Sequence, residues 1–220
     1  MIFGLPRALA VLAVLALLVP RVATAQSVPG ENRSQVERLN AFADDLLAIV
    51  ARWKASGRVE TSARMGGYAR MPDYFREETY KDAASGRVLA RVRWVAGQPD
   101  TAHMIEVFLH DGGGNLVADY YASYLVEHRN APMHALVNLH ASEGELRAFR
   151  QYDIFGELLF ERCQGRFGGE AVDLSIDAFD PEFSKDSLPE GLYAACFAAL
   201  PDAPGAFALP SAQFRETGAQ

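Results

Sequence analysis

The chain has little cysteine, no long apolar segment and none of the short motifs that mark common enzyme sites. Two cysteines occur in 220 residues, and they form neither a C-x-x-C redox pair nor a C-x-x-C-H haem-attachment site. The G-x-S-x-G, H-E-x-x-H, P-loop and strand–G-x-G-x-x-G–helix patterns are also absent. These absences argue against the standard hydrolase, zinc-protease and nucleotide-binding classes, and they favour a non-catalytic protein.

The longest apolar run lies at the N-terminus and is too short to span a bilayer. Ala8–Val19 is an unbroken stretch of 12 apolar residues after Arg7, whereas a spanning helix needs about 20. Ala23–Ala25 supplies the small–x–small pattern that a signal peptidase cleaves. We therefore predict a signal peptide over residues 1–25, with an uncleaved anchor as the alternative. The mature chain, starting at Gln26, is then periplasmic or secreted and has no membrane span.

Positive charge is scarce as well. Without Arg7 and Arg21, 19 basic residues stand against 28 acidic ones, a net charge of −9 for the predicted mature chain. This balance argues against nucleic acid and anionic lipid as partners. An envelope protein or a small ligand remains as the expected partner. Half of the residues are hydrophobic, which argues against disorder.

The two cysteines are expected to pair with each other. Cys163 and Cys196 form an even set in a chain predicted to be exported. In an oxidising compartment such a pair usually becomes a structural disulfide.

The first part of the mature chain has the periodicity of an amphipathic helix over residues 34–56. Ser34 and Glu37 fit a capping box, and Gly57 can adopt the left-handed conformation that ends a helix. Apolar residues recur every three or four positions on one stripe: Val36, Leu39, Phe42, Leu46, Ile49, Val50 and Trp53.

From residue 58 to residue 199 the apolar pattern has a period of two, which is typical of half-buried antiparallel strands. An aspartate followed by a glycine recurs between such segments, at Asp82–Gly86, Asp111–Gly114 and Asp153–Gly156, and this chemistry suits hairpin turns. We predict a single α+β domain over residues 26–200. Its helix packs on a curved antiparallel meander of about seven to nine strands. Gly191–Leu200 is the last strand or a short buried helix, and residues 201–220 form a poorly ordered tail.

The histidines are the most unusual feature, because all five fall between His103 and His140. Imidazole suits copper and zinc, so His110, His128, His134 and His140 are candidate metal ligands. They are not expected to act all together. His134 and His140 share a strand face but lie about 20 Å apart in an extended strand, and partly exposed histidines explain the pattern equally well. No other cofactor is indicated.

Two further groups of residues are candidate binding elements. Asp173, Ser175 and Asp177 share one strand face and offer oxygen ligands for calcium, although an ordinary solvent-facing side explains the same alternation. The tyrosines of the Asp119–Pro132 segment, together with Arg147, Arg150 and Arg162, suit a pocket for an anionic or sugar-like ligand. Cross-strand pairing on a wet sheet face is the alternative.

These observations favour an exported, non-catalytic accessory or binding protein. A histidine-based copper or zinc protein, and a hydrolase or isomerase with a pocket in the concavity of the sheet, are the alternatives. No residue is assigned a catalytic role, because no nucleophile, base and orienting group are brought together by the sequence.

Overall fold

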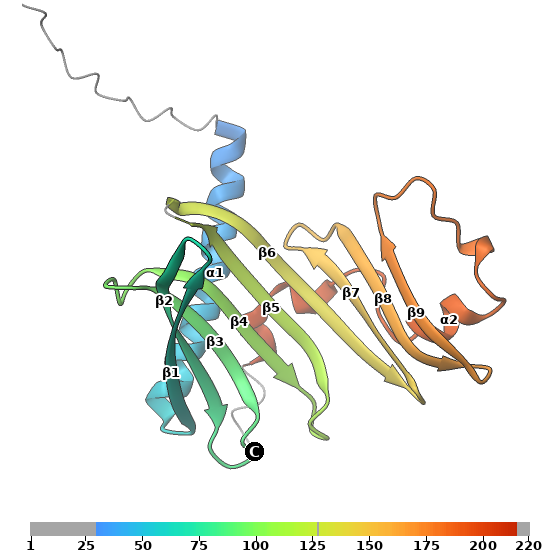
Figure 1. Cartoon of the computed structure of the whole chain (residues 1–220), viewed down its shortest axis with the longest axis horizontal. Helices are drawn as coiled ribbons and strands as arrows, with labels where there is room; N and C mark the ends of the chain where they lie inside the picture. The colour runs from blue at the N-terminus through green and yellow to red at the C-terminus, as the bar shows by residue number, and fades with distance from the viewer. Residues whose placement is uncertain (1–29, 127, 215–220) are drawn as a thin grey trace, which may run out of the picture.

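The computed structural model describes residues 30–126 and 128–214, and consists of a long helix followed by a nine-stranded sheet (Figure 1). Each strand pairs antiparallel with the next one in the chain, so the sheet order is the sequence order. The predicted α+β fold, with a helix packed on a meander of seven to nine strands, is therefore confirmed. The elements are α1 (Gly30–Ser56), β1 (Val59–Tyr68), β2 (Met71–Asp82), β3 (Val88–Val95), β4 (Ala102–His110), β5 (Leu116–Leu125), β6 (His128–Glu143), β7 (Leu146–Asp153), β8 (Leu158–Phe167) and β9 (Glu170–Asp177).

Helix α1 packs through the apolar stripe that its sequence predicts. Phe42, Leu46 and Ile49 are buried against the sheet. Gly57 has a φ of +68° and ends the helix as expected. The capping box is wrong: the helix begins four residues before Ser34, so that serine lies inside the first turns rather than at the cap.

The three aspartate–glycine segments form the hairpin turns that were predicted. The amide of Gly86 donates to the carbonyl of Asp82 at 2.8 Å, and Gly114 to Asp111 in the same way at 2.9 Å. Both glycines have positive φ, at +70° and +88°. The Asp111 carboxylate also accepts the amide of Asn115 at 2.8 Å. These repeated turns connect consecutive strands as hairpins and so produce the meander order of the sheet.

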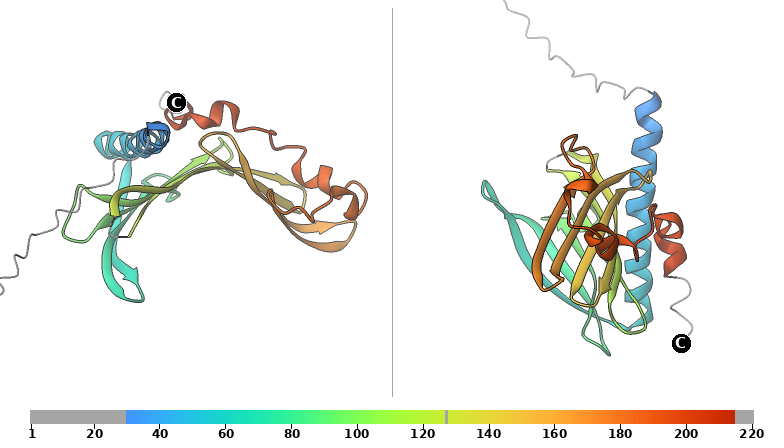
Figure 2. Two further views of the ribbon diagram at one scale, coloured as in Figure 1. Left: turned by 90° about the horizontal axis from the view of Figure 1, so that it is seen from above. Right: turned by 90° about the vertical axis from the view of Figure 1, so that its right-hand side faces the viewer.

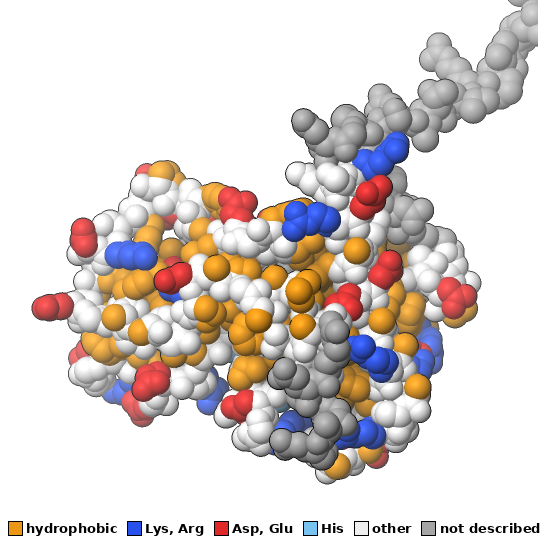
Figure 3. Space-filling view, turned by 180° about the vertical axis from the view of Figure 1, so that it is seen from behind, with side chains coloured by type: hydrophobic (Ala, Val, Ile, Leu, Met, Phe, Trp, Pro, Cys, Tyr) orange, Lys and Arg blue, Asp and Glu red, His pale blue; other side chains and the backbone are white. Residues whose placement is uncertain are grey.

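Alternation along the strands separates two faces of the sheet. One face carries fully buried residues such as Val92, Val107 and Val137, and α1 covers part of it; we call it the helix face. The opposite face carries Arg93 and His140, and we call it the open face. In the left view of Figure 2 the sheet arches, with the described helices on the outer side and the open face lining the hollow side. Figure 3 shows hydrophobic side chains gathered on the helix face beside α1.

The segment after β9 differs from the prediction. The sheet ends at Asp177, and the apolar run near residue 195 takes the alternative form of a short helix, α2 (Leu192–Phe197). It lies between a turn of 3-10 helix, η1 (Lys185–Ser187), and a second such turn, η2 (Gly205–Ala208), which is followed by α3 (Pro210–Gln213).

The expected poorly ordered tail is packed against α1 as far as Phe214. The ring of Phe214 contacts Trp53 edge-on, with centroids 5.3 Å apart, and the amide of Ser211 donates to Asp45 at 2.9 Å. Apolar side chains among the alanines and prolines explain this packing, because they can cover the helix face. Residues 1–29 and 215–220, including the predicted signal peptide, lie outside the described residues.

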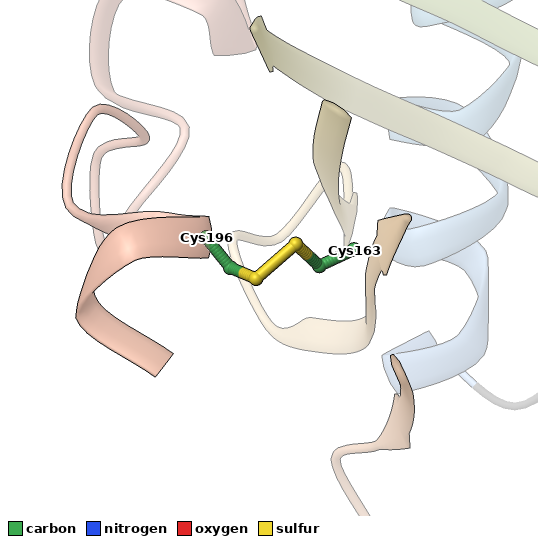
Figure 4. Close-up of a disulfide and its surroundings, with 2 residues drawn as sticks. All are labelled: Cys163 and Cys196. Carbon is green, nitrogen blue, oxygen red and sulfur yellow. A yellow bond between two sulfur atoms is a disulfide. The ribbon is translucent and has the colours of Figure 1, made fainter. Parts of the chain in front are cut away.

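The predicted disulfide is confirmed and joins α2 to the sheet (Figure 4). Cys163 of β8 and Cys196 of α2 are bonded, with their Cα atoms 5.8 Å apart, and both are buried. Of the described helices, none has the length and hydropathy needed to cross a membrane.

Candidate functional site

The four histidines proposed as metal ligands lie in different surroundings. His134 is exposed on β6, while His140 on the same strand donates from Nε2 to the Asp119 carboxylate at 2.5 Å. His110 ends β4 and lines a small cavity beside Trp53 and Phe214.

His128 begins β6, and its side chain lies outside the described part of the structure. In the described ranges no three His, Cys, Asp or Glu side chains lie close enough to hold a metal ion. Copper or zinc binding therefore stays a prediction without geometric support.

The acidic candidates share a face, as predicted, but do not form a cluster. Ser175 pairs with Arg162 across β8 and β9, and Asp173 pairs with Gln164. The Asp173 carboxylate accepts hydrogen bonds from both of these β8 side chains, at 3.3 and 3.1 Å. Asp177 accepts the amide of Phe179 at 2.9 Å, which is a local turn contact. Calcium binding also stays untested.

A hollow opens on the open face where β5 and β6 separate. Their pairing ends at Ala118 and Leu139, yet β6 continues to Glu143 and pairs there with β7 alone. The separation leaves a cavity of about 380 Å³ beside the β4–β5 turn. Its lining includes His140, Arg147 and Arg162, so one of the predicted histidines and two of the predicted arginines meet at this hollow.

Strand register arranges the side chains of this hollow in two rows. Residues opposite each other in an antiparallel pair have Cβ atoms about 5 Å apart, and diagonal neighbours lie about 7–8 Å apart. The rows across β6, β7 and β8 are His140–Phe149–Arg162 and Ser142–Arg147–Gln164. The ring of Phe149 is therefore surrounded by hydrogen-bonding side chains, of which two are arginines.

A carboxylate orients the histidine of the hollow. Asp119 accepts His140 Nε2 through one oxygen and Asn138 Nδ2 through the other, at 2.7 Å. Gln151 in turn donates to the Asn138 side-chain oxygen at 3.0 Å. With Nε2 engaged in this chain of hydrogen bonds, Nδ1 of His140 is the ring nitrogen left for a ligand.

A second basic hollow of about 380 Å³ lies on the open face at the other side of the sheet, over β1–β3. Its arginines are already paired. Arg64 and Arg93 both hold the Glu77 carboxylate, with nitrogen–oxygen distances of 2.6 and 2.8 Å. Burial by itself would raise the pKa of Glu77, but these hydrogen bonds outweigh it and the pKa is lowered. Glu77 thus stays ionised and offsets part of the positive charge of this hollow.

Arg150 does not belong to the predicted pocket. It faces the helix side of β7, where its side chain is only 5% exposed and its Nε donates to Glu161 at 2.7 Å. Its neighbours Arg147 and Gln151 point the other way, because successive strand residues alternate faces. Arg147 and Arg162 thus line the hollow, whereas Arg150 has a structural role. None of the predicted tyrosines is among the residues that line this hollow, and ligand binding stays a prediction.

An aromatic cluster that the sequence did not reveal lies at the opposite end of the open face. The side chain of His103 is buried among Tyr68, Tyr74 and Phe75, with ring centroids 5.1 to 6.4 Å away. The Tyr68 hydroxyl is hydrogen-bonded to His103 Nε2. Burial lowers the pKa of His103, and the nearby Arg93 adds to this. A neutral, packed imidazole is therefore a core element rather than a ligand.

No family model, curated protein or solved structure matches the chain.

Proposed function

We propose that the protein is an exported, non-catalytic binding protein that holds a small ligand in the β5–β8 hollow of its open face. The observation that carries this proposal is the convergence of Ser142, Arg147, Arg162 and Gln164 around Phe149, beside the oriented ring of His140. A concave site with an apolar floor and a few directed polar groups is the usual form of a small-molecule site.

The features outside the hollow support a role outside the cytoplasm. The buried disulfide between Cys163 and Cys196 suits an oxidising compartment, and residues 1–25 have the pattern of a signal peptide.

The surroundings of His140 favour binding over catalysis. Among the described residues its ring is hydrogen-bonded to Asp119 alone, and no hydroxyl or thiol stands at Nδ1 to act as a nucleophile. Both cysteines are in the disulfide. An acid–base pair without a nucleophile can orient a ligand, but it lacks the third member of a hydrolytic site.

Mass spectrometry of untagged protein collected from the export compartment tests this proposal. The denatured, non-reduced protein is expected to start at Gln26 and to be about 2 Da lighter than the reduced form, because one disulfide replaces two thiols. The native protein is expected to carry a bound small molecule. The variant Phe149→Ala should lose that molecule, while Phe179→Ala, at an exposed turn position, should retain it.

A native mass equal to the denatured mass, with no molecule recovered by solvent extraction, would contradict the ligand proposal. Recovery of copper or zinc instead would support the histidine-based alternative.

A further inference from the structure

We propose that the ligand of the β5–β8 hollow is an anion, and that its phosphate or carboxylate group is bound between Arg147 and Arg162. This inference rests on the proposed function and specifies the chemical class of the ligand.

The lining of the hollow is positively charged. The lining residues with ionisable side chains are His140, Arg147 and Arg162, and no carboxylate is among them. The chain as a whole has 28 acidic and 21 basic residues. Two carboxylates touch this lining from its edge: Asp119 accepts His140, and Asp173 accepts Arg162 and Gln164. The lining itself carries two arginines and no acid in a chain that is acidic overall, so the field inside the hollow favours anions.

The N–H donors of these two arginines are largely unused. Arg147 forms no hydrogen bond or ion pair with any described residue. Arg162 has one partner, Asp173, at 3.3 Å, and that carboxylate is 65% exposed, so the pair contributes little. The Nε of Arg162 is shielded from solvent and has no partner among the described residues. A guanidinium has five N–H donors, and both of these groups retain most of theirs.

The arginines of the β1–β3 hollow, on the same face, are paired more completely than those of the β5–β8 hollow. There Arg64 and Arg93 are held by Glu77, and Arg91 is paired with Glu106 at 3.3 Å. Both hollows are basic in composition, but carboxylates of the chain already fill the anion-binding role in the first. In the β5–β8 hollow Asp173 engages one N–H group of Arg162 at 3.3 Å, while Arg147 has no carboxylate partner among the described residues, so the anion-binding role there is filled only in part.

The spacing of Arg147 and Arg162 suits the binding of an oxyanion between them. Arg147 and Arg162 occupy diagonal positions on β7 and β8, about 7–8 Å apart at their Cβ atoms. Two guanidiniums at this spacing can donate to one phosphate or carboxylate from two sides, which is a strong charge-assisted arrangement. The hydroxyl of Ser142 adds a neutral donor, and the amide of Gln164, which donates one hydrogen to Asp173 at 3.1 Å, keeps a second. Phe149 offers a flat apolar surface to the rest of the ligand. A neutral ligand would remove water from both guanidinium groups without neutralising their charge, so an anion is the favoured ligand.

Titration with inorganic phosphate, followed by isothermal calorimetry and by NMR of the arginine Nε–H signals, tests the inference on the mature protein. Wild-type protein is expected to bind one phosphate, with a shift of the Arg162 Nε–H signal, and affinity should fall as sodium chloride is raised. Arg147→Gln and Arg162→Gln should each weaken binding about tenfold or more, the expected loss for a charge-assisted hydrogen bond.

Lys81→Gln is the matched control. Lys81 lines the β1–β3 hollow and has no partner among the described residues, so the substitution removes one positive charge and no contact. Its phosphate affinity should stay within about twofold of wild type. Equal weakening in all three variants, or none in any, would show only nonspecific screening and would overturn the inference.

The same experiments distinguish a wrong ligand class from a hollow that binds no ligand at all. If the molecule that co-purifies is neutral, and is lost in Phe149→Ala but retained in Arg147→Gln, the hollow is a binding site and the anionic class is wrong. If neither phosphate nor any extracted molecule perturbs the hollow, both proposals fail.

Discussion

Replacing Arg150 with methionine is expected to destabilise the protein strongly while leaving the open face intact. Arg150 is the centre of the junction between the sheet and the C-terminal segment. Its Nη1 donates to the carbonyls of Leu200 and Pro201 at 2.9 and 3.0 Å. Its Nε donates to Glu161, which also accepts the hydroxyl of Tyr193 at 2.9 Å. Burial alone would lower the pKa of Arg150, but these partners raise it, so the charge persists.

The magnitude follows from the burial of the pair. The side chains of Arg150 and Glu161 are 5% and 4% exposed. Breaking such a pair by removing one member leaves an uncompensated charge, which costs about 3–5 kcal/mol. That is a large part of a typical free energy of unfolding of about 5–15 kcal/mol. For a chain of this size the melting temperature should fall by roughly 10 °C or more.

Urea unfolding followed by tryptophan fluorescence and circular dichroism measures the effect. Arg147→Met is the control, since it removes an arginine from the exposed side of the same strand and should change stability by less than about 0.5 kcal/mol. The double variant Arg150→Met/Glu161→Leu should recover most of the loss, because no buried charge is left unpaired. A cost below about 1 kcal/mol for Arg150→Met would refute this reasoning, as would a double variant less stable than the single one.

Three further outcomes are expected. Cys163→Ala/Cys196→Ala should lower the free energy of unfolding by about 4 kcal/mol, from the chain entropy of a loop of 33 residues; unchanged stability in urea would contradict this. Burial lowers the pKa of His103 from its ordinary 6.5, so the unfolded chain takes up a proton first and stability is lost as pH falls below 6.5; His103→Asn should make that slope shallower, and an identical slope would disprove the assignment. Gly67→Ala places a Cβ 1.9 Å from the Met71 carbonyl oxygen and should cost about 1–3 kcal/mol, whereas Gly112→Ala, with no atom within 4 Å, should be close to neutral in the same thermal melts.

The site was only partly predictable. Arg147, Arg162 and His140 were candidates because of their residue types, but Phe149, Ser142 and Gln164 were not. Their roles depend on which residue of one strand lies opposite which residue of the next, and an apolar pattern of period two does not determine that pairing. Asp119 was similarly hidden, since its partner His140 is 21 residues away along the chain.

The sequence also could not separate Arg150 from Arg147 by function. Both are arginines on one predicted strand, and alternation alone predicts that they face opposite sides. Which side carries the helices is settled by packing: the face with the continuous set of apolar residues takes α1 and the C-terminal segment. Arg150 is on that face and finds Glu161 there.

The sequence alone determined the elements of this protein: the amphipathic helix, the strands of period two, the aspartate–glycine turns and the cysteine pair. The helix, strands and turns follow from local chemistry, since a turn or a periodic stripe involves residues close together in the chain. The cysteine pair, 33 residues apart, followed from an even cysteine count in a chain predicted to be exported. Only the tertiary structure decided how far the C-terminal segment packs along α1, which is as far as Phe214. It also decided where β5 and β6 separate. It decided, too, which arginines of the open face are paired with carboxylates, as Arg64 and Arg93 are with Glu77, and which are not, as with Arg147. These features depend on contacts between distant residues, whose free energies are set by burial and register rather than by local pattern.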